Sequence, residues 1–239
     1  MTDRADNIKI ADNIKDVVVF QDIPVNLDLK DIINKCHLNN ENDIERVTEL
    51  VDEAIEVARP RGIFKESHIQ KRGQDYVIIN GIKFNSHVMY INLKDIYKVY
   101  PYIVTAGSEL ETWASNFNDI LENYWADIIQ KEILEGASNY IFARLKDIYN
   151  PGSIAIMNPG SLDWPISEQK KLFKLLGNYA DRIGVRLTDS YLMVPTKSLS
   201  GLVFPSTTDF KNCRLCSREQ CPGRRAPYDN KLSREYGMK

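Results

Sequence analysis

The chain has 239 residues, a length that can bury a hydrophobic core without disulfides or structural metals. Hydrophobic residues make up 43% and charged residues 27%, and the formal net charge of −2 at pH 7 excludes a general attraction to nucleic acids or anionic membranes. The longest apolar runs, such as VVVF at 17–20, are too short to span a bilayer, and the N-terminus has no apolar signal core. We therefore expect a cytoplasmic protein whose partners include neither membrane nor nucleic acid.

The first part of the chain predicts a leader, a helix and a hairpin. Residues 1–22 are interpreted as a mobile leader. From Asn42 onward, apolar residues recur at helical spacing, and Pro60 ends this helix because proline lacks a backbone donor. Farther on, the sequence YVIINGIKF at 76–84 places Asn80-Gly81 between two apolar runs, the preferred sequence of a two-residue hairpin turn.

A long helical region is predicted from about Glu109 to Tyr149. Residues three or four positions apart form a continuous apolar stripe made of Leu121, Trp125, Ile128, Ile129, Ile133, Ala137, Ile141, Leu145 and Ile148. Two carboxylates at the start, Glu109 and Glu111, either line a site or complement the helix dipole, and the second reading is the commoner one.

Strands and one more helix are predicted after this region. Pro151 and Gly152 break the long helix, and SIAIM at 153–157 follows as a strand. Ser167 is the predicted N-cap of the next helix, with Gly177 near its C-terminal end. Residues 185–206 are predicted to form strands joined by short turns.

Two segments of the chain have a distinctive sequence, NPGSLDWPISEQ at 158–169 and GVRLTDSYLMVPTKSLSGLVFP at 184–205. They resemble the activation domain of vitamin B12-dependent methionine synthase. The matching positions are Leu187, Thr188, Asp189, Ser190, Tyr191, Met193, Pro195, Ser198, Ser200, Gly201 and Phe204. The ending CPGRRAPY is similar to that of the truncated, free-standing versions of this domain, which carry a cysteine cluster.

The resemblance implies an α+β fold, a twisted antiparallel sheet packed with helices, over residues 23–210. A Cys-rich segment and tail follow at 211–239. The implied function is an accessory role in the reductive reactivation of a corrinoid-dependent methyltransferase in methionine biosynthesis. The chain would act in trans on a separate corrinoid protein that carries cobalamin, with a low-potential electron donor and a methyl group from S-adenosylmethionine. The implied cofactor-binding residues are Asn158, Pro159, Gly160, Ser161, Tyr191, Ser200 and Gly201.

The chain departs from the family at two positions beside the Pro159-Gly160 turn, and the late pair of tyrosines of the family also has no counterpart near Phe210. The resemblance places an arginine three residues before Pro159 and a tyrosine directly after Gly160, and both contact S-adenosylmethionine. This chain has Ile156 and Ser161 there. Because isoleucine cannot provide the guanidinium fork that holds a carboxylate, binding of S-adenosylmethionine stays an open alternative.

Three of the four cysteines are crowded near the end of the chain. Cys213, Cys216 and Cys221 have the spacing C-x2-C-x4-C among several arginines, which favour thiolates, the ligand form of cysteine. Cys36 is the only other candidate for a fourth ligand. Three readings compete: an iron–sulfur cluster such as a four-iron cluster, structural zinc, or reduced thiols without metal.

The alternative function class is a zinc-stabilised, non-enzymatic binding module. The basic sequence RLCSREQCPGRR at 214–225 would then be its contact surface. No phosphate-binding loop, dinucleotide-binding glycine motif or nucleophile elbow is present in the sequence.

Overall fold

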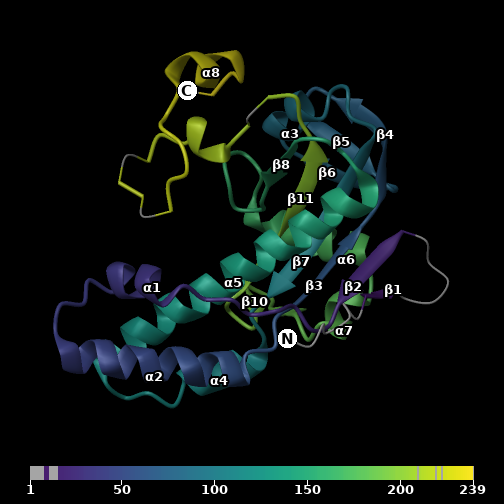
Figure 1. Ribbon diagram of the computed structural model, residues 1–239. Coiled ribbons are helices and arrows are strands. Elements are labelled where there is room, and N and C mark those ends of the chain that lie inside the picture. Colours follow the sequence, from purple (N-terminus) through teal and green to yellow (C-terminus); the bar gives the residue numbers. More distant parts are fainter. Residues whose placement is uncertain (1–7, 11–15, 209, 219, 222, 239) are drawn as a thin grey trace. The chain divides into compact units, whose positions relative to one another are not determined.

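The computed structural model describes residues 8–10, 16–208, 210–218, 220–221 and 223–238 (Figure 1). The chain divides into two units, and each consists of three separate stretches of sequence. Unit 1 contains Met1–Ile63, Ile103–Asp147 and Asn178–Leu199. Unit 2 contains Phe64–Tyr102, Ile148–Gly177 and Ser200–Lys239. None of the described helices is long and apolar enough to cross a membrane.

Unit 1 begins with a strand pair where the sequence predicted a leader. β1 (Ile8–Ile10) pairs antiparallel with β2 (Val17–Phe20). All four residues of β2 are buried, at most 5% exposed. Residues 17–20 of the predicted leader therefore form a buried strand, because burial of β-branched residues and phenylalanine is favourable. The remaining residues of the predicted leader lie largely outside the described ones.

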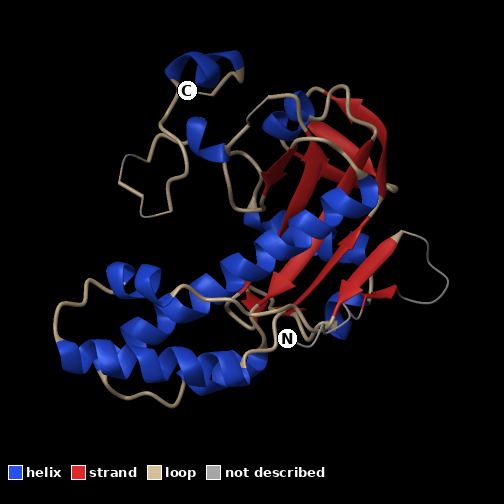
Figure 2. Cartoon of the chain, in the orientation of Figure 1, coloured by secondary structure: helices blue, strands red, loops and turns tan. Residues whose placement is uncertain are grey.

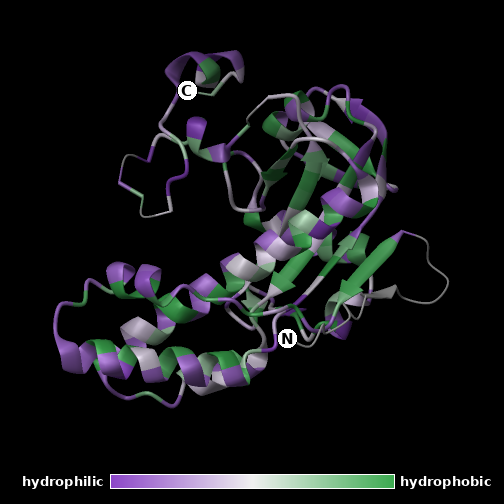
Figure 3. Cartoon of the chain, in the orientation of Figure 1, coloured by the Kyte–Doolittle hydropathy of each residue, from purple (hydrophilic) through white to green (hydrophobic). Residues whose placement is uncertain are grey.

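The helix predicted from Asn42 is confirmed as α2 (Glu41–Val57). Asn40 caps it, since its side chain accepts a hydrogen bond from the backbone N–H of Asn42 at 3.0 Å. One face, with Val47, Leu50, Val51 and Ala54, is buried. Figure 3 shows the corresponding alternation of hydrophobic and hydrophilic residues along this helix.

The long helical region is interrupted, contrary to the prediction of one region from about Glu109 to Tyr149. It consists of α4 (Ser108–Ala114) and α5 (Ile120–Tyr149), both visible as helices in Figure 2. Asp119 starts the second helix, because its carboxylate accepts hydrogen bonds from the N–H groups of Leu121 (2.8 Å) and Glu122 (3.1 Å). The predicted apolar stripe lies within α5, and most of its residues are buried, whereas Leu121 (54% exposed) and Ile148 (43% exposed) at the two ends of the stripe are not.

Unit 1 is completed by short elements. These are α1 (Leu29–Lys35), the start of β3 (Arg61–Lys65), α7 (Tyr179–Arg182) and the antiparallel pair β9 (Arg186–Leu187) and β10 (Met193–Val194). Glu109 forms an ion pair with Arg61 (2.5 Å), and Glu111 accepts hydrogen bonds from the N–H and hydroxyl of Thr196, both at 2.7 Å. Both carboxylates therefore make structural contacts.

Unit 2 contains an antiparallel sheet, as the fold class predicted. β4 (Ser67–Gly73), β5 (Tyr76–Ile79) and β6 (Ile82–Asn85) are consecutive antiparallel neighbours. Asn80 and Gly81 join the last two with φ of 45° and 80°, which confirms the predicted hairpin turn. β7 (Lys98–Thr105) pairs with β4 through Ser67 and Val99.

A second antiparallel pair of unit 2 carries the segment of interest. β8 (Ile154–Met157) pairs with β11 (Ser198–Pro205), with Met157 opposite Leu202. The helices of this unit are α3 (His87–Asn92), the 3-10 helix η1 (Ile166–Glu168), α6 (Gln169–Leu176), the 3-10 helix η2 (Asn212–Arg214) and α8 (Asn230–Glu235). The mixed helix and antiparallel sheet class is thus confirmed.

The helix that was predicted to be capped by Ser167 begins in another way in the structure. Ser167 lies inside η1 and does not cap a helix, because Pro165 starts the 3-10 turn two residues earlier. Gly177 does end α6, in a backbone conformation with φ of +67° that favours glycine.

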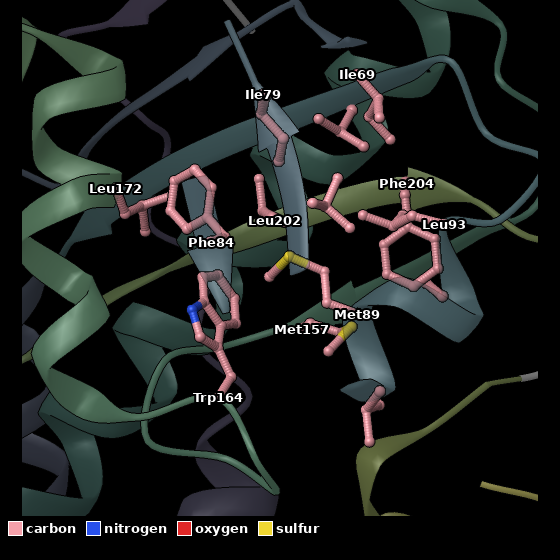
Figure 4. Close-up of a cluster of buried hydrophobic side chains, with 14 of the residues drawn as sticks. Ile69, Ile79, Phe84, Met89, Leu93, Met157, Trp164, Leu172, Leu202 and Phe204 are labelled. Atoms are coloured by element: carbon pink, nitrogen blue, oxygen red, sulfur yellow. The ribbon is translucent and has the colours of Figure 1, made fainter. Parts of the chain in front are cut away.

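The core of unit 2 joins strands, helices and the loop after β8. In Figure 4 the side chains of Phe84, Met89, Met157, Trp164 and Leu202 point toward one another. Phe84 and Trp164 meet edge to face, with ring centroids 6.1 Å apart. The loop that follows β8 is therefore anchored in the core by its tryptophan, which is 1% exposed.

Candidate functional site

The candidate site is built around Asn158, the residue directly after β8. Its side-chain nitrogen donates to the hydroxyl of Tyr102 and to the carbonyl of Ser200, both at 2.8 Å. These partners lie on β7 and β11. The predicted residues Asn158 and Ser200 are therefore in contact, and Asn158 positions the turn that follows it.

Gly201 makes this arrangement sterically feasible. A Cβ atom at this position would lie 2.3 Å from the carbonyl oxygen of Met157, 2.8 Å from the side-chain nitrogen of Asn158 and 3.0 Å from the ring of Tyr102. Any other residue would push β11 away from β8. Glycine is therefore needed at position 201, because the backbones of β11 and β8 approach each other closely beside Asn158.

The predicted turn Pro159-Gly160-Ser161 is closed by its own hydrogen bonds. The N–H of Gly160 donates to the carbonyl of Trp164 (2.8 Å), and the N–H of Ser161 donates to the carbonyl of Asn158 (3.1 Å). Gly160 has φ of +84° and is exposed, whereas Pro159 is buried. Because both N–H groups are used internally, a ligand at this turn would meet its carbonyl groups and the exposed surface of Gly160.

Two acidic residues fasten the same loop to α3 and β6. Asp163 accepts hydrogen bonds from the hydroxyl of Ser86 (2.6 Å) and from the N–H groups of His87 (2.5 Å) and Val88 (3.2 Å). The carboxylate therefore caps the first turn of α3 from a distant part of the chain. Glu168, which is 6% exposed, accepts hydrogen bonds from both the backbone and the side chain of Asn85 at 3.2 Å.

Tyr102 is the site residue that sequence reasoning missed. It is 2% exposed, and burial raises the pKa of its hydroxyl to about 12, although the hydrogen bond from Asn158 and the positive charge of Arg225 act in the opposite direction. The sequence YPYIVT at 100–105 gave a strand signal, but no local pattern linked Tyr102 to a residue 56 positions away.

Tyr191, also predicted as a binding residue, belongs to unit 1. It lies at the tip between β9 and β10 with φ of +65°, and its N–H donates to the carbonyl of Thr188 at 3.0 Å. The hydroxyl of Thr188 accepts a hydrogen bond from the N–H of Leu192 at 3.0 Å. The L-T-D-S-Y motif therefore forms a tight turn, and its role in ligand binding stays a prediction.

The three clustered cysteines lie in what we call the cysteine turn, the described residues of 213–226. Each of the three thiols is half-buried. Cys36 lies in unit 1 at the end of α1, 6% exposed, and burial raises its pKa to about 11. Among the described residues, no three His, Cys, Asp or Glu side chains are placed to hold a metal ion. The cysteines are of the right chemical type for zinc or iron, but their placement does not form a ligand set.

Comparison with known proteins bears on this same region. Residues 159–223 match the model of a family described as the vitamin B12-dependent methionine synthase activation domain. The match covers less than half of the chain, begins at the Pro159-Gly160 turn and extends past Cys221. A search of curated proteins found no match.

A solved structure agrees with the fold. The chain is similar to one described as the crystal structure of the MetH reactivation domain bound to AdoHcy, with a TM-score of 0.56 and 15% sequence identity. The similarity covers 79% of this chain and 73% of that chain. At this identity the similarity concerns the fold. Together the two findings confirm the resemblance to the activation domain that the sequence indicated.

Proposed function

We propose that this protein is a reactivation module for a cobalamin-dependent methyltransferase, in the methionine synthase system, and that it acts on a separate corrinoid protein. The observation that carries the proposal is the match of residues 159–223 to the activation domain family. The proposal is also supported by the similarity in fold to the solved reactivation domain, which covers 79% of this chain.

The reaction served by such a module has two steps. An electron from a low-potential donor reduces cobalt(II) in the partner to cobalt(I). Cobalt(I) then takes the methyl group of S-adenosylmethionine, which leaves as S-adenosylhomocysteine. The chain itself would contribute binding and orientation, while the cobalt carries the bond changes.

The turn at Asn158–Ser161 is the proposed place for the methyl donor. Two observations support this place. The solved structure of similar fold is described as bound to AdoHcy, and the family match begins at Pro159. Asn158 would act indirectly, because its side-chain nitrogen already binds Tyr102 and Ser200. Ligand contacts would come from Gly160 and the carbonyl groups of the turn.

An iron–sulfur cluster or zinc at the cysteine turn stays a separate prediction. The thiols of Cys213, Cys216 and Cys221 are suitable donors for either, and the family match includes all three. Since the described side chains do not form a ligand set, no step of the proposed reaction depends on this metal.

The proposal is tested with an oxidised corrinoid protein in the cobalt(II) state. Methylcobalamin formation is followed by its visible spectrum with reductant and S-adenosylmethionine, with or without this protein. We expect faster methylation with the protein and no methylation without S-adenosylmethionine. Equal rates with and without the protein would contradict the reactivation role. Stoichiometric zinc together with equal rates would favour the alternative, a zinc-stabilised binding module.

A further inference from the structure

The side chain of Arg224 joins separate parts of the cysteine turn. One terminal guanidinium nitrogen donates to the carbonyl groups of Cys213 and Ala226, each at 3.1 Å. The other donates to the carbonyl of Cys216 at 3.1 Å and also to that of Arg218. A single half-buried cation therefore gathers four backbone carbonyls.

The backbone of the turn closes around the same residue. The N–H of Arg224 donates to the carbonyl of Cys221 at 3.0 Å, and the N–H of Cys216 donates to the carbonyl of Cys213 at 3.3 Å. The next N–H, of Arg225, points to the sulfur of Cys213 at 3.4 Å. All three cysteines are thus held through backbone groups that Arg224 contacts directly or through a neighbour.

Arginine is suited to this role in a way that lysine is not. Converging carbonyl oxygens repel one another unless a donor lies between them. The guanidinium is planar, always charged and offers five N–H groups in a fixed fork, so that one side chain satisfies several acceptors. A lysine ammonium has three donors on a flexible stem and cannot span the same set of carbonyls.

The turn is also attached to unit 2 without any use of its sulfur atoms. Leu215, between the first two cysteines, is 3% exposed and belongs to the hydrophobic core of the unit. Arg214 pairs with Asp229 at 2.7 Å, and the N–H of Asp229 donates to the carbonyl of Arg214 at 2.8 Å. The packing of Leu215 and the Arg214–Asp229 pair therefore hold the start of the turn against the rest of the unit.

We infer that Arg224, and not a bound metal, holds the cysteine turn in shape. The contacts of its guanidinium supply the cross-links that a metal supplies in small zinc domains, which unfold without their ion. The turn is therefore formed in the metal-free protein, and its shape does not depend on metal binding by the three thiols. This inference is independent of the proposed reactivation role.

Amide hydrogen exchange of the metal-stripped protein tests the inference. The variants are Arg224→Lys, the neighbouring control Arg225→Lys, and a triple variant with Cys213→Ser, Cys216→Ser and Cys221→Ser. Arg224→Lys is expected to raise exchange in peptides of 213–226 by about tenfold or more, because several charge-assisted hydrogen bonds are lost. Arg225→Lys and the triple variant are expected to keep the protection of the parent protein.

Exchange in peptides from β5 and β6 reports whether a variant is folded. Treatment of the parent protein with chelator tests the role of metal without any substitution. Protection of the turn after treatment with chelator and reductant supports the inference. If chelator or the triple cysteine variant abolished protection, or if Arg224→Lys exchanged like Arg225→Lys, a metal or the thiols would be the organising element and the inference would be wrong.

Discussion

The side-chain nitrogen of Asn158 lies 2.8 Å from the hydroxyl of Tyr102 and 2.8 Å from the carbonyl of Ser200. One amide therefore ties the end of β8 to β7 and β11. We therefore expect the stability of the Pro159-Gly160 turn to depend on this bridge.

Asn158→Ala removes both hydrogen bonds and should lower the free energy of unfolding by about 1–3 kcal/mol. Urea unfolding measures the change. Asn118→Ala is the control, because Asn118 is exposed and lies outside the bridge. Its effect should remain within about 0.5 kcal/mol. An equal effect of the two substitutions would mean that the bridge is not formed in solution.

Gly201→Ala should destabilise the protein by about 1–3 kcal/mol, since the new methyl group would collide with the carbonyl of Met157. The contrasting variant is Gly136→Ala in the interior of α5, where a Cβ meets no atom within 4 Å. The free energy of unfolding of that variant should rise by about 0.5–1 kcal/mol, because alanine has a higher helix propensity than glycine. Thermal unfolding of both variants checks the opposite signs, and a stable Gly201→Ala protein would contradict the close strand approach.

Tyr102 should make stability depend on alkaline pH. Its pKa is raised from 10.0 to about 12 in the folded protein, so folding favours the protonated hydroxyl. This contribution is fully present below pH 10 and is lost as pH rises toward 12. The urea midpoint at pH 8 and pH 11 is compared between the parent chain and Tyr102→Phe. The parent should lose more stability than the variant, and identical losses would show that Tyr102 is not buried.

Thiol labelling should separate Cys36 from the other cysteines. Burial keeps Cys36 at 6% exposure and raises its pKa to about 11, so at pH 8 it is protonated and shielded. Metal-free folded protein should react with three equivalents of reagent, and a fourth should react only in urea. Cys36→Ala should remove the slow equivalent alone. Fast reaction of all four would contradict the position of Cys36.

Asp163→Ala should remove the cap that Asp163 provides to the start of α3 and should lower the free energy of unfolding by about 1 kcal/mol. Asp163→Asn keeps one acceptor oxygen and should lose less. The measurement is amide exchange at His87 and Val88, whose N–H groups bind the carboxylate. Unchanged exchange in Asp163→Ala would show that Ser86 caps the helix alone.

Features with local causes were predictable from the sequence. The Asn80-Gly81 hairpin depends on two residues that accept positive φ, and α2 depends on spacing and a cap within a few positions. The fold class was predicted from motif residues at 158–169 and 184–205, and the solved structure of similar fold confirmed it.

Features with distant causes were not predictable. The break between α4 and α5 has a local cause, the cap at Asp119, but it was missed because the cap does not disturb the apolar periodicity around it. Tyr102 contacts Asn158 across 56 positions, and Asp163 contacts His87 across 76. Such contacts are set by the tertiary fold, which a single sequence does not reveal.

The capping of α3 by Asp163 makes that helix a natural reporter of events in the loop after β8. Any compound that shifts this loop must also alter the three hydrogen bonds at the start of the helix. The signals of His87 and Val88 in a nuclear magnetic resonance spectrum would then move upon titration, even though neither residue touches the compound. A ligand screen could therefore be read at those two amides without any knowledge of the reaction.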